Sequence, residues 1–166
     1  DYYCSSHKNF RILDLGCNCG RFLKYMYNQG YTDLHGIDFS KEALNHFELN
    51  NPDAIKSVTL YQDFFQRFLI KSQTKSYDCI YSYGSTIEDV HPSFDIIKHI
   101  CRITSKYVII QIVEHKQYTR FYQLEFERNG FYLVRAIRSA AQDVVGDEQQ
   151  QMSILIFQSY QYRWRN

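Results

Sequence analysis

The sequence has little proline and glycine, no long hydrophobic run and almost no net charge. With 2 prolines and 7 glycines in 166 residues it contains no flexible linker or low-complexity tract, and no internal repeat is visible. No apolar stretch approaches the ~20 residues of a membrane-spanning helix, and no signal peptide stands out. A formal charge of +1 gives the whole molecule no field that would attract a polyanion, so nucleic acid is disfavoured as a partner.

The five cysteines show no repeated pair spacing, which predicts reduced thiols rather than a disulfide framework. Cys17 and Cys19 form a Cys-x-Cys pair, but no second Cys or His pair at zinc-site spacing accompanies them. We therefore expect no metal site. Reduced thiols and the lack of a targeting or membrane segment together predict a cytoplasmic protein.

Apolar and aromatic side chains are abundant, at 45% and 17% of the residues. A chain of 166 residues can bury one good core and is too short for two full domains, so we expect a single domain over residues 1–166. Residues 1–9 are polar and aromatic without periodicity, which predicts an irregular lead-in.

The most informative stretch is residues 11–20, Arg-Ile-Leu-Asp-Leu-Gly-Cys-Asn-Cys-Gly, which predicts a strand, a turn and the start of a helix. Gly16 and Gly20 suit a sharp turn that brings backbone N–H groups close to a ligand, and the helix start behind them favours a negative group. Asp14 would repel a pyrophosphate but attract an ammonium group. A ligand with both charges, such as an amino acid moiety, fits this loop best.

The order Asp-Leu-Gly-Cys-Asn-Cys-Gly at residues 14–20 resembles the first motif of the class I S-adenosylmethionine-dependent methyltransferases, acidic-x-Gly-x-Gly-x-Gly. Asn18 replaces the middle glycine. Asparagine tolerates left-handed backbone angles, and its amide could bind the cofactor carboxylate. The resemblance implies S-adenosyl-L-methionine as the cofactor, with its methionine part bound by Asp14, Gly16, Cys17, Asn18 and Gly20.

A short second strand over residues 34–37 ends in Asp38, and Ser40 can cap the next helix. In a doubly wound sheet, the residue at this place faces the ribose of a bound nucleoside, where a carboxylate accepts both hydroxyl protons. The position of Asp38, ~20 residues after the glycine loop, fits this role. Phe39 could then cover one face of the adenine.

The ends of the third and fourth strands supply the remaining predicted cofactor residues. The third strand, residues 58–61, is followed by Asp63 and Phe64, and the resemblance implies that Asp63 accepts from the adenine amino group. The Tyr-Asp-x-Ile-x-Ser pattern at residues 77–82 resembles the family's strand beside the methyl-transfer centre, which places Tyr81 and Ser82 in the site.

Periodicity predicts helices over residues 21–28, 41–49, 65–73, 93–104 (capped by Ser93) and 119–129, and further strands over 10–15, 107–113, 131–137 and 152–160. Residues 139–151 predict a polar loop between the last two strands. The fold class is therefore α/β: a Rossmann-like, doubly wound, seven-stranded, mostly parallel sheet with a C-terminal antiparallel hairpin. The resemblance covers residues 11–160, and it implies a substrate-capping segment that residues 1–9 are too short to form.

Methyl transfer from a sulfonium can rely on positioning alone, so the lack of a catalytic triad or paired carboxylates does not exclude an enzyme. For a hydroxyl acceptor a base helps, and His91 is the first candidate, ahead of Glu88 and His115, because these residues lie in loops after the fourth and fifth strands. No Asn-Pro-Pro-Tyr motif follows the fourth strand, which disfavours N-methylation of an amide or a base. The near-neutral charge, the aromatic loops and the compact core favour a small-molecule or sugar hydroxyl as the acceptor. The alternatives are a non-catalytic binding or assembly module and a nicotinamide-dependent oxidoreductase.

Overall fold

The structure, a computed structural model, describes residues 7–84, 87–113, 120–145 and 148–162. Its strands are β1 (Arg11–Leu15), β2 (Asp33–Asp38), β3 (Val58–Gln62), β4 (Tyr77–Ser82), β5 (Thr104–Val113), β6 (Phe131–Val145) and β7 (Glu148–Ser159). Its helices are α1 (Arg21–Asn28), α2 (Lys41–Asn50), α3 (Phe65–Lys71), α4 (Ile96–Ile103), α5 (Tyr122–Arg128) and the short 3₁₀ helix η1 (Ala54–Ser57).

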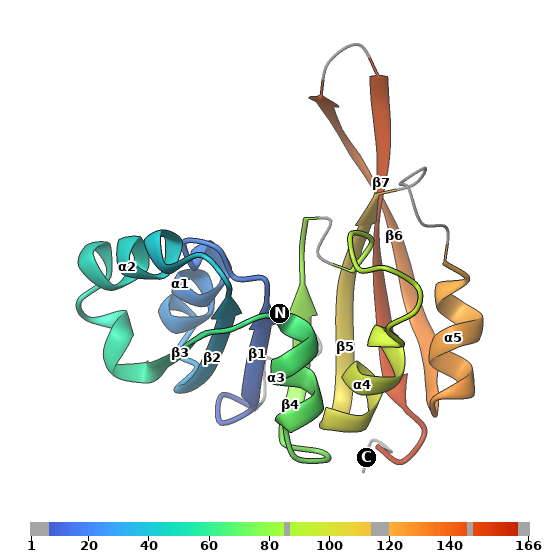
Figure 1. The fold of residues 1–166 in the computed structure, drawn as a ribbon, viewed down its shortest axis with the longest axis horizontal. Coiled ribbons are helices and arrows are strands. Elements are labelled where there is room, and N and C mark those ends of the chain that lie inside the picture. The colour runs from blue at the N-terminus through green and yellow to red at the C-terminus, as the bar shows by residue number, and fades with distance from the viewer. Residues whose placement is uncertain (1–6, 85–86, 114–119, 146–147, 163–166) are drawn as a thin grey trace.

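The strands form a single seven-stranded sheet in the order β3-β2-β1-β4-β5-β7-β6 (Figure 1). β1 to β5 run parallel, and β7 is antiparallel to both of its neighbours. The strand order reverses between β1 and β4, and ligands of such sheets bind beside the carboxyl ends of the strands at this switch point. The predicted fold class is confirmed.

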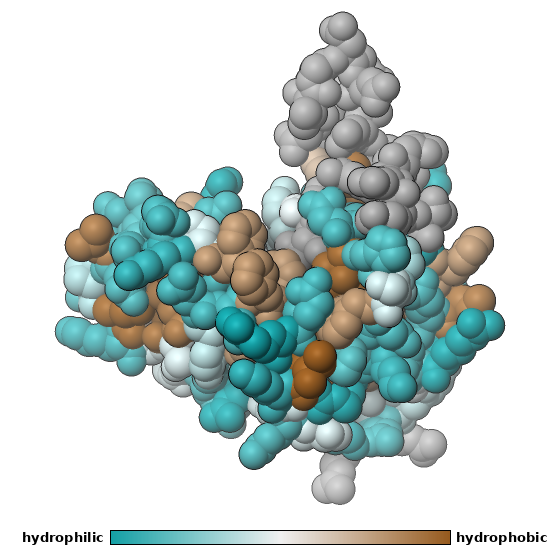
Figure 2. Space-filling model, viewed as in Figure 1, coloured by the Kyte–Doolittle hydropathy of each residue, from teal (hydrophilic) through white to brown (hydrophobic). Residues whose placement is uncertain are grey.

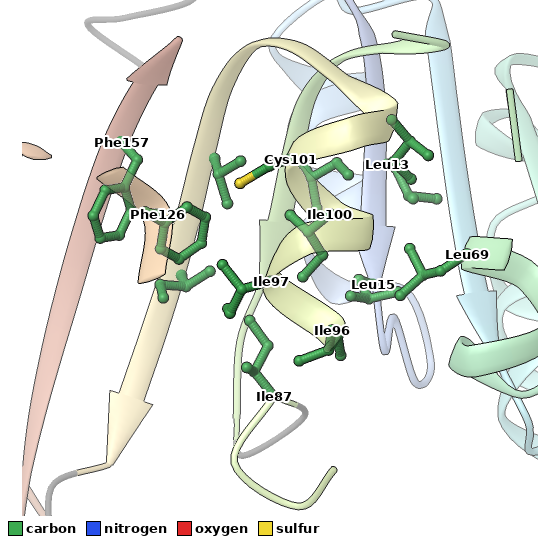
Figure 3. Close-up of a cluster of buried hydrophobic side chains, with 14 of the residues drawn as sticks. Leu13, Leu15, Leu69, Ile87, Ile96, Ile97, Ile100, Cys101, Phe126 and Phe157 are labelled. Carbon is green, nitrogen blue, oxygen red and sulfur yellow. The ribbon is translucent and has the colours of Figure 1, made fainter. Parts of the chain in front are cut away.

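Two hydrophobic layers cover the sheet, because successive side chains of a strand point to opposite faces. Leu13 of β1 belongs to the layer beneath α3, α4 and α5 (Figure 3), whereas Ile12 belongs to the layer beneath α1 and α2. Both faces of the central strands are thus largely buried, which explains the adjacent apolar residues of β1 and β5, whereas the edge strand β3 leaves Thr59 exposed.

Side-chain caps define the starts of two helices. Ser40 caps α2 by accepting the N–H of Ala43 at 3.2 Å, as predicted. The cap of α4 is not Ser93 but Asp95, whose carboxylate accepts the N–H of Lys98 at 3.1 Å. Both residue types are good caps, and the hydrogen bond to the third following N–H decides between them.

The prediction of a loop over residues 139–151 is wrong, because β6 continues to Val145 and β7 begins at Glu148. β5 ends at Val113, which pairs with Met152, so the two last strands continue past the carboxyl end of β5 (Figure 1). There they pair with each other, through rungs such as Val144 with Gln149. The hairpin therefore rises above the edge of the sheet where ligands bind.

The face that carries α3, α4 and α5 is mostly hydrophilic, with scattered hydrophobic patches (Figure 2). Among the described helices, none combines the length and the apolar character needed to cross a membrane.

Candidate cofactor site

The loop between β1 and α1 folds back onto the end of β2. The N–H groups of Gly16 and Cys17 both donate to the carbonyl oxygen of Ile37, at 2.9 and 3.0 Å. Asn18 adopts a left-handed conformation with φ 47°, as its replacement of a motif glycine suggested. Gly20, with φ 69°, packs so closely that a Cβ atom there would lie 2.2 Å from Cδ2 of Phe47.

All the N–H groups at the tip of this loop are engaged within the chain. The N–H of Cys19 donates to Oδ1 of Asn18 at 2.7 Å, and that of Gly20 donates to the carbonyl of Cys17 at 2.8 Å. The N–H groups of Gly16 and Cys17 therefore shape the loop, and the predicted contact of these two residues with the cofactor stays a prediction. The groups left for an anion are the side-chain amide of Asn18 and the N–H groups of the first turn of α1.

Asp38 at the end of β2 holds the loop in place. One carboxylate oxygen accepts the N–H of Asn18 at 2.8 Å, and the other accepts the N–H of Ser40 at 2.9 Å. A carboxylate offers about four acceptor positions, so both oxygens can still accept hydroxyl protons from a ribose. Asp38 is thus oriented by the backbone and retains the capacity that its predicted role requires.

Asp14 is almost fully buried, with 3% of its surface exposed, and it lies between Gly36 and Tyr81 in the sheet register. None of the hydrogen bonds found among the described residues reaches its carboxylate. Burial, and secondarily the charge of Asp38, raises its pKa to about 8. A buried carboxylate without a donor favours a cationic ligand group, since a cation would restore its ionised form.

Two exposed aromatic rings stand at the other end of the site. Phe39 and Phe64 follow β2 and β3, are 60% and 62% exposed, and lie parallel within 6°, with ring centroids 6.2 Å apart. The N–H of Asp63 donates to the carbonyl of Asp38 at 3.2 Å, which fixes the two strand ends together. The carboxylate of Asp63 accepts the N–H of Phe64 and pairs with Arg67.

At the end of β4, Tyr81 stacks on Phe22 of α1, with ring centroids 3.7 Å apart. Tyr81 is the β4 residue beside Asp14 in the sheet register, and burial, and secondarily the charge of Asp14, raises the pKa of its hydroxyl. Ser82 is buried and donates to the carbonyl of Leu15 at 3.1 Å. Its observed role is to join β4 to β1, and its predicted cofactor contact stays a prediction.

The candidate bases lie differently from one another. The side chain of His91 is exposed, and its Nδ1 accepts the N–H of Ser93 at 3.2 Å. Glu88 is 2% exposed and accepts the N–H of Val113 at 2.7 Å. His115 lies outside the described residues. Because an imidazole that accepts at Nδ1 carries its proton on Nε2, the observed geometry gives His91 a turn-capping role, and its predicted role as a base stays a prediction.

Sequence reasoning missed Phe22 and Gln111. Phe22 lies in the helix predicted over residues 21–28, but its stacking on Tyr81 has no local sequence signal. Gln111 is 4% exposed, and its Oε1 accepts the N–H of Gly84 at 3.1 Å. A glutamine within the apolar run of β5 was the available signal, since buried polar groups need partners.

Within the described part of the chain, no cluster of His, Cys, Asp and Glu side chains could hold a metal ion. The described cysteines are free thiols, with the Sγ of Cys17 buried and 3.8 Å from the carbonyl oxygen of Asn18. Burial, followed by the charges of Asp14 and Asp38, raises the pKa of that thiol. Cys17 therefore packs beneath the loop as a neutral side chain.

Comparisons with known proteins agree with this geometry. A family model described as a methyltransferase domain matches residues 12–106. No curated protein matches in sequence. Among solved structures, an S-adenosylmethionine-dependent methyltransferase from Mesorhizobium loti is 13% identical, with a TM-score of 0.74 over 90% of this chain and 91% of that one.

Two further structures share the fold. The magnesium protoporphyrin IX methyltransferase of Synechocystis, solved with bound SAM, has a TM-score of 0.75 and 13% identity over 95% of this chain and 74% of that one. A TehB-like SAM-dependent methyltransferase from Corynebacterium glutamicum has a TM-score of 0.70 and 20% identity over 91% of this chain and 80% of that one. Since the family model covers more than half of the sequence, the chain belongs to the methyltransferase domain family and is a class I S-adenosylmethionine-dependent methyltransferase.

Proposed function

We propose that the chain binds S-adenosylmethionine along the carboxyl ends of β1, β2 and β3 and transfers its methyl group to the hydroxyl of a small molecule or sugar. The observation that carries the site assignment is Asp14. A buried carboxyl group without a described donor is unfavourable by itself, and the α-ammonium group of the cofactor has the charge and the hydrogens to satisfy it.

Each end of the cofactor has a matching group. The side-chain amide of Asn18 and the first-turn N–H groups of α1 would hold the carboxylate of the methionine part. Asp38 would accept both ribose hydroxyls, because its carboxylate is already oriented by two backbone donors. Phe39 and Phe64 would cover the adenine, a planar group that stacks favourably on aromatic rings.

Asp63 would accept a hydrogen bond from the adenine amino group, because its carboxylate has acceptor positions that the ion pair with Arg67 does not use. Tyr81 would flank the methionine part from the β4 side, since it lies beside Asp14 in the sheet register.

When bound, the cofactor would supply a sulfonium methyl group: the acceptor oxygen would bond to the methyl carbon as the C–S bond breaks in line, a neutral thioether would leave, and the hydroxyl proton would pass to solvent. The chain's contribution is then to fix both reactants, which can supply much of the rate without a base. The capping bond of His91 agrees with this reading. A general base at His91 would first require the hydrogen bond from Ser93 to break.

A labelled-methyl assay tests the activity. The folded protein, incubated with methyl-labelled S-adenosylmethionine and separated small-molecule and macromolecular fractions of a cell extract, is expected to label the small-molecule fraction. Label in macromolecules alone would contradict the proposed acceptor class. Binding of the cofactor with no transfer to either fraction would favour the non-catalytic binding module.

A His91→Gln variant tests the base in the same assay. Loss of a general base lowers the rate by ~10²-fold or more, whereas the capping role predicts a rate close to that of the wild type.

A further inference from the structure

Beyond the cofactor contacts, three aromatic rings gather at the carboxyl end of β4. Tyr81 lies 3.7 Å from Phe22 and 6.3 Å from Tyr83, measured between ring centroids. Both pairs are close to parallel, with interplanar angles of 11° and 12°. The three rings share nearly one orientation, and Tyr83 is the exposed member of the group.

The backbone beside Tyr83 is fixed although its ring is 51% exposed. The N–H of the next residue, Gly84, donates to Oε1 of Gln111, and the Nε2 of Gln111 lies 2.7 Å from the sulfur of Met152. Gln111 is almost fully buried, so this anchor is held by two neighbouring strands. The backbone that carries Tyr83 is therefore held in place, so that binding need not order it.

The position of Tyr83 relates it to the methyl donor, and this step rests on the proposed function. Tyr81 pairs with Asp14 in the sheet register, and Asp14 would hold the methionine part of the cofactor. Tyr83 comes two residues later, just past the end of β4. It thus stands beside the reacting end of the cofactor, opposite the adenine end marked by Phe39 and Phe64.

We propose that the acceptor is a planar aromatic molecule that stacks on Tyr83 and carries the hydroxyl to be methylated. A ring held parallel to others offers its face to a further ring in the offset-stacked geometry that aromatic pairs prefer. A sugar would need hydrogen-bonding groups beside the ring. The nearby amide of Gln111 is almost fully buried and already bonds to Gly84 and Met152, so it offers little to a sugar. This narrows the acceptor class from small molecules and sugars to aromatic ones.

A matched pair of probes tests this inference. 2-Naphthol and its saturated counterpart decahydro-2-naphthol carry the same hydroxyl on a planar and a non-planar skeleton. Each is titrated calorimetrically into the protein already loaded with the demethylated cofactor. The wild type is expected to bind 2-naphthol about 2- to 13-fold more tightly, the range that aromatic pairing supplies.

Three variants assign the preference to one ring. Tyr83→Leu is expected to abolish it, and Tyr83→Phe to keep it. Tyr160→Leu is the control, because Tyr160 is also exposed (56%) beside another tyrosine, Tyr132, but follows the antiparallel strand β7 and so lies away from the carboxyl ends of the parallel strands. It should bind like the wild type.

Cofactor loading is measured first and separately, so a failure of the proposed function shows as absent loading. In that case both probes are titrated into the unloaded protein, and the ratio of the two affinities is compared with the same expectation. Equal affinities, binding of neither probe, or a preference that survives Tyr83→Leu would overturn the inference.

Discussion

The backbone N–H of Asn18 donates to the carboxylate of Asp38 at 2.8 Å, across 20 residues of sequence. This bond joins the tip of the cofactor loop to the end of the neighbouring strand. The residue proposed to bind the ribose therefore also shapes the loop proposed to bind the methionine part. The two halves of the cofactor site are built as one unit.

The buried carboxyl of Asp14 predicts a dependence of stability on pH. Its pKa is raised to about 8 in the folded chain from 3.8, so between these values the folded state retains a proton that the unfolded state has released. Its contribution to stability is present below pH 3.8 and is lost as pH rises towards 8. Within that window, the unfolding free energy of Asp14→Asn minus that of the wild type should rise by ~1.4 kcal/mol per pH unit. Denaturant titrations at pH 5, 6 and 7 measure this; a constant difference would contradict it.

The same group predicts proton release on cofactor binding. At pH 7 the Asp14 carboxyl of the free protein is mostly protonated, and the arriving ammonium group favours its ionised form. Titration of the wild type with the demethylated cofactor in buffers of different ionisation enthalpy should show close to one proton released. In Asp14→Asn the release should vanish. Binding without release by the wild type would place the ammonium group elsewhere.

The close approach of Gly20 to Phe47 predicts a stability difference between two glycine substitutions. Gly20 (φ +69°) and Gly30 (φ +88°) both have left-handed backbones, but a Cβ at Gly30 meets nothing within 4 Å. Gly30→Ala should therefore show only the backbone strain of ~1 kcal/mol. Gly20→Ala should cost at least ~1 kcal/mol more, because Phe47 must move. Urea unfolding compares the two variants. Equal losses of unfolding free energy would show that Phe47 and the loop can move apart at no cost.

Glu88 is predicted to act as an anchor for the turn after β4. It accepts the N–H of Val113, and the neighbouring Ile87 inserts into the core beside Ile96 and Ile97 (Figure 3). Glu88→Ala should lower the unfolding free energy by ~2 kcal/mol, because the buried N–H of Val113 loses its acceptor. Glu88→Gln, which keeps an acceptor oxygen, should lose less.

The control for Glu88 is Glu48→Ala, which removes an exposed carboxylate from α2 and should be nearly neutral. Chemical denaturation of the four proteins gives the comparison. A Glu88→Ala variant as stable as the wild type would remove the anchor from this account.

The element order could be predicted because the parallel strands are rich in apolar residues and the helices place their apolar residues on one face. The far part of the hairpin could not. There β6 and β7 pair with each other beyond the end of β5, and backbone pairing does not require the apolar residues that mark a strand buried in a sheet. The polar stretch at residues 139–151 therefore gave no strand signal.

In the site, residue types and spacing predicted Asp14, Asn18 and Asp38, since these carry charge or an unusual backbone angle at a recognisable turn. Their mutual arrangement came only from the structure, because the hydrogen bond from Asn18 to Asp38 depends on how two strands lie side by side. Likewise the pairing of Phe39 with Phe64 joins two strand ends that no local pattern connects.

Calorimetric titration of the folded protein with the demethylated cofactor, for the wild type and Asp38→Ala, tests the central claim most directly. Asp53→Ala is the control, because Asp53 is exposed and its side chain caps no helix. One-to-one binding by the wild type and by Asp53→Ala is predicted, with a loss of at least ~100-fold in Asp38→Ala, since two hydrogen bonds to a charged group disappear. No binding by the folded wild type, or undiminished affinity in Asp38→Ala, would contradict the account.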